Sequence, residues 1–347
     1  MADPVRVAIV GCGFFARNHL FSWKDLEAEG SVRLVAVCDI DAAKAKAAAE
    51  EFGVPNWYVD FDAMLEKEQI DLIDIITRMD THRLLVEKTV GRGIATIVQK
   101  PFAPNWDDAV AMTKAADKAG VYLAVHENFR FQTPLLKAAE AVAAANIGTP
   151  TWGRISFRTG YDIYKNQPYF HNEERLIILD LGVHTLDIAR VMMGEVEHVY
   201  AETQSLNPKN RAEDTATVLL RHVNGAVSVV DFSYESRKQP DTFPETLMEI
   251  EGPKGAIVIT PGLKMRVNIG DDIRETDIGS ALLHWTSEPW HVAQESVLST
   301  CRHLLEAYKA GKAADISAVD NLKTFALAEA AYESAATGRA VRPRTYS

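Results

Sequence analysis

The fold of the N-terminal part of the chain is decided by residues 5–16, Val5-Arg6-Val7-Ala8-Ile9-Val10-Gly11-Cys12-Gly13-Phe14-Phe15-Ala16. The first half is an apolar, β-branched run typical of a buried strand, and it leads directly into a GxGxxA turn and a helix-forming stretch. Gly11 permits a tight turn, Gly13 allows a close approach to a pyrophosphate, and Ala16 allows the helix to pack closely on the strand. The N–H groups at the start of such a helix favour phosphates. We therefore predict a dinucleotide site over Gly11, Gly13, Phe14, Phe15 and Ala16.

The same alternation of strand and helix continues to residue 126. It is typical of a parallel sheet that helices cover on both faces. The predicted strands are Val5–Val10, Arg33–Cys38, a short segment from Tyr58, Asp71–Ile76, Ala95–Val98 and Tyr122–Val125, and the predicted helices are Ala16–Glu29, Ala42–Phe52, Asp60–Lys67, Thr81–Arg92 and Asn105–Ala119. We therefore expect an α/β Rossmann domain, a doubly wound parallel sheet, over residues 1–126.

The pattern changes in residues 127–347, where predicted strands follow one another without helices between them. This favours an α+β domain with a large, mostly antiparallel sheet. We expect strands near residues 151–160, 196–204, 214–222, 225–233, 246–251 and 256–259, helices over Pro134–Ala145 and Leu181–Met193, and a helical tail over Ala293–Lys309 and Val319–Ala336.

The composition excludes several classes of protein. Of the 347 residues, 48 are acidic and 37 basic, a net charge of −11, and no basic run is present, so we expect no nucleic-acid partner. Cys12, Cys38 and Cys301 lack metal-ligand spacing, so we expect neither a disulfide framework nor a metal. The sequence has no run of about 18 apolar residues and no leader before Val5. We therefore expect a cytoplasmic protein that does not enter a membrane.

Asp39 and Ile40 follow the second predicted strand and bear on the choice of dinucleotide. A carboxylate at this place hydrogen-bonds the adenosine ribose and repels a 2′-phosphate, and Ile40 stands where an arginine would favour NADP. We therefore predict NAD as the cofactor. The alternative is that Asp39 only caps the next helix, a role that Asp41 could fill equally well.

Four motifs, in this order, resemble those of the Gfo/Idh/MocA oxidoreductase family, and the resemblance covers essentially the whole chain. They are the GxGxxA turn, Gln99-Lys100-Pro101, Asn128-Phe129-Arg130-Phe131 and Asp180-Leu181-Gly182-Val183-His184-Thr185-Leu186-Asp187. The resemblance implies that Lys100, Asp180 and His184 form a catalytic centre beside the nicotinamide. It also implies that residues 127–347 bind the substrate and pair into a homodimer or homotetramer.

The predicted fold supports the three catalytic residues independently. Lys100 follows a strand directly, and ligands bind at the carboxyl ends of strands in such sheets. Asp180 and His184 are four residues apart, which on a helix places both on one face, about 6 Å apart along the axis. Hydride transfer from a hydroxyl-bearing carbon needs a base, for which His184 is suited, while Lys100 stabilises charge on the oxygen and Asp180 binds a neighbouring hydroxyl. The alternative for Asp180 and His184 is a purely structural pair.

Further positions are assigned by the same resemblance. Thr77 and His82 match positions that line the cofactor, and Asn128 matches one near the nicotinamide and substrate. Arg158 lies where substrate hydroxyls would be recognised. Gln99 stands where the family usually has glutamate, and its amide can still form the hydrogen bonds of a cofactor site.

Three features are left with two interpretations each. Arg78 either pairs with Asp80 on the surface, which we favour, or contacts the dinucleotide phosphates. Arg130 either lines the crevice near the nicotinamide and substrate, like Asn128, or forms a salt bridge. The aromatic segment over residues 284–291 either contacts a sugar or lies in a subunit interface.

The resemblance implies an NAD-dependent oxidoreductase that acts on CH–OH groups of a sugar or polyol. We expect an aldose, and within the family a pentose such as D-apiose, to be oxidised at the anomeric carbon to the lactone. One alternative is a cyclitol dehydrogenase of the inositol type. The other is a non-catalytic NAD-binding sensor, although a sensor has no need for Lys100, Asp180 and His184 together.

Overall fold

The computed structural model describes residues 3–144 and 147–346, and its contacts divide the chain into two compact units. The first unit runs to Glu127 and includes Val297–Leu322 and Tyr346, and the second comprises Asn128–Ser296 and Lys323–Thr345. The sequence analysis assigned everything after residue 126 to the second domain. In the structure, part of the helical tail belongs to the first unit, because the edge strand at Leu123–His126 needs a backbone partner. The N–H of Val125 donates to the carbonyl oxygen of Ile316 at 3.0 Å.

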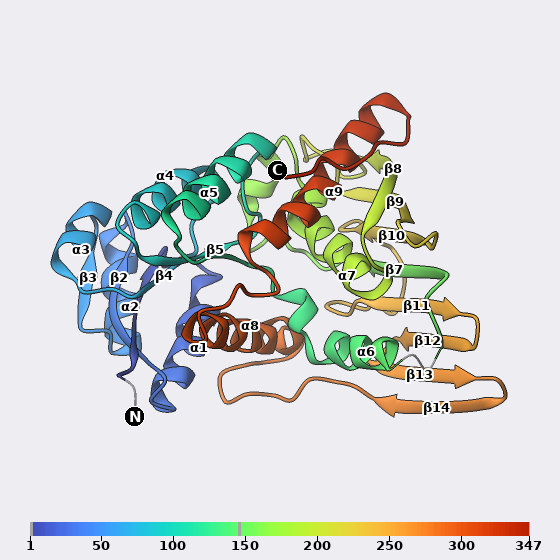
Figure 1. The fold of residues 1–347 in the computed structure, drawn as a ribbon, viewed down its shortest axis with the longest axis horizontal. Coiled ribbons are helices and arrows are strands. Elements are labelled where there is room, and N and C mark those ends of the chain that lie inside the picture. The colour runs from blue at the N-terminus through green and yellow to red at the C-terminus, as the bar shows by residue number, and fades with distance from the viewer. Residues whose placement is uncertain (1–2, 145–146, 347) are drawn as a thin grey trace. The chain divides into compact units, whose positions relative to one another are not determined.

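The first unit contains a six-stranded parallel sheet in the order β3-β2-β1-β4-β5-β6, as predicted for a Rossmann domain. The strands are β1 (Val5–Val10), β2 (Val32–Cys38), β3 (Asn56–Tyr58), β4 (Leu72–Ile75), β5 (Ala95–Gln99) and β6 (Leu123–His126), and the helices between them are α1 (Ala16–Ala28), α2 (Ala42–Phe52), α3 (Phe61–Lys67), α4 (Met79–Val90) and α5 (Trp106–Ala119). Figure 1 shows α4 and α5 on one side of this sheet and α1 on the other. The strand order reverses between β1 and β4, which is where ligands bind in such sheets.

The second unit contains an eight-stranded sheet in the order β14-β13-β12-β11-β7-β10-β9-β8, visible on the right of Figure 1. Only β7 and β10 pair in parallel, so the predicted mostly antiparallel sheet is confirmed. The strands are β7 (Trp152–Arg158), β8 (Val196–Gln204), β9 (Thr215–His222), β10 (Val227–Ser233), β11 (Leu247–Gly252), β12 (Gly255–Thr260), β13 (Lys264–Ile269) and β14 (Asp272–Asp277).

Helices cover one face of this sheet. They include α6 (Thr133–Ala143), α7 (Val183–Met193) and the part of α9 (Ala318–Thr337) from Lys323 onward, while α8 (His291–Lys309) begins in the second unit and continues in the first. The helix predicted over 134–145 ends at Ala143 as described, and Ala145 lies outside the described residues. Alternate residues of β7, such as Ile155 and Phe157, are buried, which is the pattern of a strand with one face on a core.

Strands β13 and β14 were not predicted. All six residues of β14 are exposed, so no alternation of apolar and polar residues marks the strand in the sequence. The pair forms by antiparallel pairing around a turn at Gly270, whose φ of +57° suits glycine. Among the residues that the structure describes, no helix combines the length and apolar character needed to cross a membrane.

Candidate active site

The glycine-rich turn after β1 has the geometry that its sequence predicts. Gly11 has a φ of +95°, and a Cβ atom there would lie 2.4 Å from the carbonyl oxygen of Ile76, so a side chain is excluded. A Cβ on Gly13 would meet no atom within 4 Å, which leaves the backbone open to a ligand. Phe15 precedes α1 and provides no side-chain cap, and the N–H of Asn18 in the first turn donates to the carbonyl oxygen of Phe15 at 3.1 Å. The start of a helix attracts an anion. These features fit the pyrophosphate of a dinucleotide.

Asp39 is held beside this turn and does not cap α2. Its carboxylate accepts hydrogen bonds from the N–H of Cys12 at 2.7 Å and from the N–H of Asp41 at 2.8 Å. Asp41 caps α2, which removes the structural alternative for Asp39. Phe14 and Ile40 are 53% and 95% exposed, so apolar side chains border the turn and the end of β2. The carboxylate thus stands where a ribose hydroxyl would be bound.

A buried chain of hydrogen bonds supports the backbone at Lys100, which follows β5. The N–H of Lys100 donates to Oε1 of Gln99 at 2.7 Å, and Nε2 of Gln99 lies 3.2 Å from Nε2 of His19. His19 Nδ1 and Trp23 Nε1 both lie 2.7 Å from Oδ2 of Asp74. Because the amide of Gln99 donates to Nε2 of His19, the proton of His19 is on Nδ1 and is shared with Asp74. Burial opposes ionisation, but His19 and Trp23 hold the pKa of Asp74 below its usual value.

The same network contains a cluster of metal-type donors that the sequence spacing could not indicate. The ligand atoms of His19, His126 and Cys301 lie within 4.8 Å of one another, and all three side chains are buried. Burial lowers the pKa of His126 to about 3 and raises that of Cys301 well above its usual value, which favours neutral side chains. Both ring nitrogens of His19 already have partners, Nε2 with the amide of Gln99 and Nδ1 with the carboxylate of Asp74. We therefore interpret His19, His126 and Cys301 as members of the hydrogen-bond network and not as metal ligands.

Two other predicted cofactor residues follow β4, Thr77 in the loop after the strand and His82 in the first turn of α4. His82 is fully buried, and its two ring nitrogens lie 3.1 Å from the carbonyl oxygens of Phe102 and Thr77. His82 thus connects the loop after β4, at Thr77, with the loop after β5, at Phe102. Arg78 pairs with Asp80 at 3.6 Å, which is the surface pairing that the sequence analysis favoured.

Asp180 lies in the second unit, in a π-helical turn, η3 (Ile178–Gly182), that leads into α7. The sequence analysis expected an α-helical i, i+4 arrangement with His184, and the structure corrects this. Tyr234, which directly follows β10, donates a hydrogen bond from its hydroxyl to Oδ2 of Asp180. Burial and the charge of Asp180 raise the pKa of Tyr234 far above its usual value, so it remains a donor. A Cβ on Gly182 would lie 2.8 Å from the ring of Phe232, and this close contact explains the glycine.

Phe129 is next to Asn128 in the sequence and next to His184 in space. Asn128 and His184 are both buried in the second unit. The ring of Phe129 is stacked on the imidazole of His184, with centroids 3.8 Å apart and planes 5° apart. Nδ2 of Asn128 donates to Oγ of Ser296 at 2.7 Å. Among the described residues, Oδ1 of Asn128 has no hydrogen-bond partner although it is buried, so it is an acceptor suited to a ligand amide.

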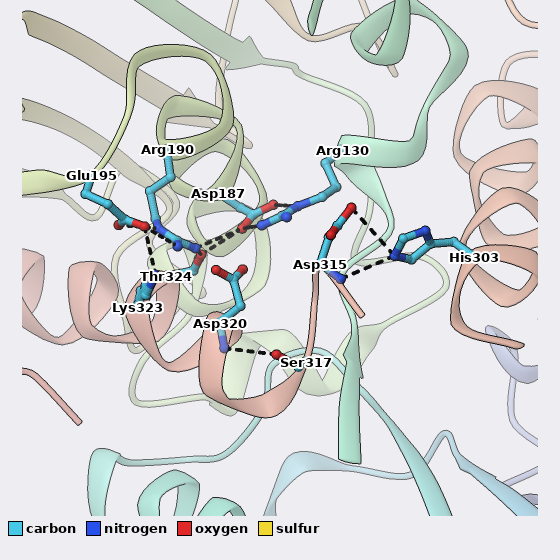
Figure 2. Close-up of polar contacts among 10 residues, drawn as sticks. All are labelled: Arg130, Asp187, Arg190, Glu195, His303, Asp315, Ser317, Asp320, Lys323 and Thr324. Carbon is cyan, nitrogen blue, oxygen red and sulfur yellow. Dashed lines mark hydrogen bonds and ion pairs between the residues drawn. The ribbon is translucent and has the colours of Figure 1, made fainter. Parts of the chain in front are cut away.

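Arg130 forms the salt bridge that was one of its two interpretations. Its guanidinium donates to both carboxylate oxygens of Asp187, with Nε 2.6 Å from Oδ2, and Asp187 is fully buried. Figure 2 shows Arg130 reaching Asp187, and Arg190 approaching the same carboxylate beside Thr324.

Arg158 is not brought near Asp180 or His184. It ends β7 on the face opposite to Phe157, whose ring lies 6.0 Å from that of Phe129 on the helix-covered face. Its Nη1 lies 3.9 Å from Asp231 of β10 instead. The alternation of side chains along β7 places Arg158 on the face opposite to Phe157, and its predicted contact with the substrate stays a prediction.

A cavity of about 460 Å³ lies in the second unit beyond the ends of β7 and β10. Trp290 packs edge-on against Tyr161 and Phe243, which are stacked with centroids 4.2 Å apart. The aromatic segment thus contributes to a cluster within its own unit. The residues that line the cavity are Gly160, Tyr161, Ser236, Arg237, Gln239, Asp241, Phe243 and Pro289.

The predicted site residues divide between the two units. Lys100 and the residues of the glycine-rich turn belong to the first unit, and Asn128, Asp180 and His184 belong to the second. The approach of Lys100, Asp180 and His184 to one substrate oxygen stays a prediction.

Comparisons with known proteins agree with this architecture. A family model described as "Oxidoreductase family, NAD-binding Rossmann fold" matches residues 5–127, and the "GFO/IDH/MocA C-terminal domain" matches residues 135–258. A D-apiose dehydrogenase of Rhizobium rhizogenes is 44% identical over 334 residues, which cover 96% of each chain. A myo-inositol 2-dehydrogenase of Thermotoga maritima is 27% identical over 97% of this chain and 98% of its own.

One solved structure is similar over nearly its whole length. It is an oxidoreductase from Agrobacterium radiobacter in complex with NAD+, L-tartaric acid and magnesium. It shares 44% of its sequence with this chain, covers 97% of this chain and 98% of its own, and superposes with a TM-score of 0.94. The predicted family, fold class, oxidoreductase class and NAD cofactor are thereby confirmed.

Proposed function

Because the chain belongs to the GFO/IDH/MocA oxidoreductase family, we propose that it is an NAD-dependent sugar dehydrogenase. The proposed substrate is an aldose, specifically a pentose such as D-apiose, oxidised at the anomeric carbon to the lactone. The observation that carries the proposal is 44% identity to a D-apiose dehydrogenase over nearly the full length of both chains. Lys100, Asp180 and His184 are all present, which supports catalysis over a role as an NAD-binding sensor.

The first unit offers the groups that a bound NAD requires. Gly11, Gly13 and the start of α1 would bind the pyrophosphate, and Asp39 would bind the ribose hydroxyls. The buried Oδ1 of Asn128 would accept a hydrogen bond from the carboxamide of the nicotinamide. When bound, NAD supplies the hydride acceptor.

The remaining chemistry falls to three side chains. In the proposed mechanism His184 accepts the proton of the anomeric hydroxyl as hydride leaves the carbon. The ammonium group of Lys100 donates a hydrogen bond to the same oxygen and stabilises its developing negative charge. Asp180, oriented by Tyr234 through Oδ2, binds a neighbouring hydroxyl and holds the sugar in place.

The test is a substrate panel with NAD and with NADP, followed by the absorbance of the reduced nicotinamide. D-apiose and other aldoses are expected to reduce NAD, and the product is expected to be a lactone that releases acid on hydrolysis. Reduction of NAD by myo-inositol but not by aldoses would replace this proposal with the cyclitol dehydrogenase. Tight NAD binding without turnover of any sugar or polyol would replace it with the sensor.

We also propose that the protein is a homodimer or homotetramer that pairs through the outer face of the eight-stranded sheet. Leu219 and Val227 are large apolar residues that remain 45% and 36% exposed on this face, beside a cavity of about 550 Å³. Replacing both by serine should dissociate the oligomer in light scattering after size-exclusion chromatography. A monomeric wild-type protein would contradict this proposal.

A further inference from the structure

The aromatic ring of Phe129 lies against the imidazole of His184. The two rings are stacked face to face at 3.8 Å, and their planes differ by only 5°. Phe129 opens a short 3-10 turn, η1 (Phe129–Phe131), and its ring is supported by Phe157 of β7 at 6.0 Å. A flat ring in this position favours an imidazole plane parallel to its own, whereas an aliphatic side chain has no flat face to favour one plane.

The next residue fastens the same turn to the helix that carries His184. Arg130 binds both oxygens of Asp187, which lies three residues after His184 on α7. A guanidinium paired with a carboxylate through two hydrogen bonds has a fixed geometry. The turn η1 therefore touches α7 at two points one helical turn apart, through Phe129 on His184 and through Arg130 on Asp187.

The carboxylate of Asp187 is itself held in place. Oγ1 of Thr324 donates to it at 2.7 Å, and Nη1 of Arg190 lies 3.6 Å away. Arg190 in turn pairs with Glu195 at 2.9 Å, and Lys323 binds the same glutamate at 3.1 Å. Figure 2 shows this series of contacts joining the turn, α7 and α9. All of these residues belong to the second unit.

We propose that Phe129 and Arg130 are positioning residues that hold the imidazole of His184 in the orientation required for proton transfer. This inference rests on the proposed function, because it gives His184 the role of the base. Neither Phe129 nor Arg130 exchanges a proton in this proposal. Their contribution is to keep the accepting nitrogen of His184 in line with the substrate hydroxyl, and a small loss of alignment lowers the rate.

The test compares three variants of the full chain with a matched control. Phe129→Leu removes the flat ring, Phe129→Tyr keeps it, and Arg130→Lys keeps the charge but loses the two-point pairing. Arg6→Lys is the control, because Arg6 also binds both oxygens of an aspartate, Asp71, but near the start of β1 in the first unit. Unfolding temperature and NAD affinity are measured for each.

The orientation of His184 is read by NMR with labelled histidine, its signal being assigned from its absence in His184→Gln. A stacked phenyl ring shifts the ring protons of the imidazole upfield. The shift should be lost in Phe129→Leu, reduced in Arg130→Lys, and kept in Phe129→Tyr and Arg6→Lys. This readout requires no turnover, so it examines the geometry separately from the chemistry.

The kinetic expectation is a loss in kcat and not in cofactor binding. Phe129→Leu and Arg130→Lys should lower kcat with the best aldose by roughly tenfold to hundredfold, with NAD affinity unchanged. Phe129→Tyr should retain most of the rate, because it keeps the flat ring on the imidazole of His184. If Phe129→Leu does not fold, Arg130→Lys tests the same point.

Two results would overturn the proposal in different ways. Loss of the upfield shift with kcat unchanged would show that the orientation of His184 does not matter, while leaving the dehydrogenase intact. Full turnover by His184→Gln would remove the base from the proposed function, and the positioning role with it.

Discussion

Two aspartates at the end of β2 differ in function although they differ little in sequence context. Asp41 caps α2, whereas Asp39 binds the N–H of Cys12 within the glycine-rich turn. The position of Asp39 after a predicted strand is the reason that it is predicted to bind the ribose. The role of Tyr234 could not be predicted in this way. The residues around Tyr234 give no indication that it binds Asp180, which lies 54 residues earlier in the chain.

Asp39→Asn should shift the cofactor preference toward NADP. The amide oxygen can still accept the hydrogen bond from Cys12, but the charge that repels a 2′-phosphate is gone. The ratio of kcat/KM for NADP to that for NAD should rise about tenfold, corresponding to about 1.4 kcal/mol. Asp41→Asn is the control, because asparagine caps a helix as well as aspartate does and the ratio should not change. An unchanged ratio in Asp39→Asn would exclude the ribose role.

Tyr234→Phe should lower kcat by about tenfold to hundredfold, because a hydrogen bond to a charged group is worth about 1.5–3 kcal/mol. Lys100→Ala and His184→Ala should each lower it by orders of magnitude, and NAD affinity should remain nearly intact in all three variants. Tyr346→Phe, which also loses a hydrogen bond to an aspartate, Asp117, serves as the control at the surface. Equal loss of NAD binding in the Lys100 and His184 variants would show that the reactive centre lies elsewhere.

At the scale of elements, the short turn η1 and the π-helical turn η3 matter more to the candidate site than the regular helices do. The sequence motifs that contain them were recognised, but their conformations were not. The α-helical spacing expected for Asp180 and His184 is not found, because residues 178–182 form a wider π-helical turn. In this turn Gly182 lies close to the ring of Phe232. Strands β13 and β14 were not predicted, because neither strand has a buried face and so neither shows the alternation of apolar and polar residues that identifies a strand in a sequence.

The ion pairs that join α7 to α9 should make stability depend on pH in a defined direction. Burial would raise the pKa of Glu195, but Arg190 and Lys323 outweigh it and lower the pKa from 4.5 to about 2. A lowered pKa means that the stabilisation is present above about pH 4.5 and is lost as the pH falls toward 2. Because Glu195 is half exposed, Glu195→Gln should cost only about 0.5–1 kcal/mol in urea unfolding at pH 7.

The difference between Glu195→Gln and the wild type should shrink between pH 4.5 and pH 3. Glu50→Gln, on the exposed side of α2, is the control and should change the free energy of unfolding little at either pH. A destabilisation by Glu195→Gln that stays constant over this range would show that the ion pairs are not its cause.

At the scale of the whole molecule, the chain consists of two units with different architectures, and the helical tail contributes to both. NAD should stabilise the protein against heat, because a ligand that binds only the folded state raises its free energy of unfolding. At a concentration one hundred times Kd, the gain is about 2.7 kcal/mol. Thermal unfolding with NAD and with NADP measures it, and a larger shift with NADP would contradict the predicted preference.

The sequence by itself determined the Rossmann domain, the NAD cofactor and the family to which the chain belongs. These follow from local patterns. A glycine-rich turn between a strand and a helix, or an aspartate at the end of a strand, can be recognised from a few neighbouring residues. Only the tertiary structure decided that Phe129 lies on His184, that Tyr234 binds Asp180, that Gln99 joins a buried network with Asp74, and that Arg158 faces away. Such contacts join residues that are far apart in the chain. They depend on close packing in three dimensions, which a local sequence pattern does not show.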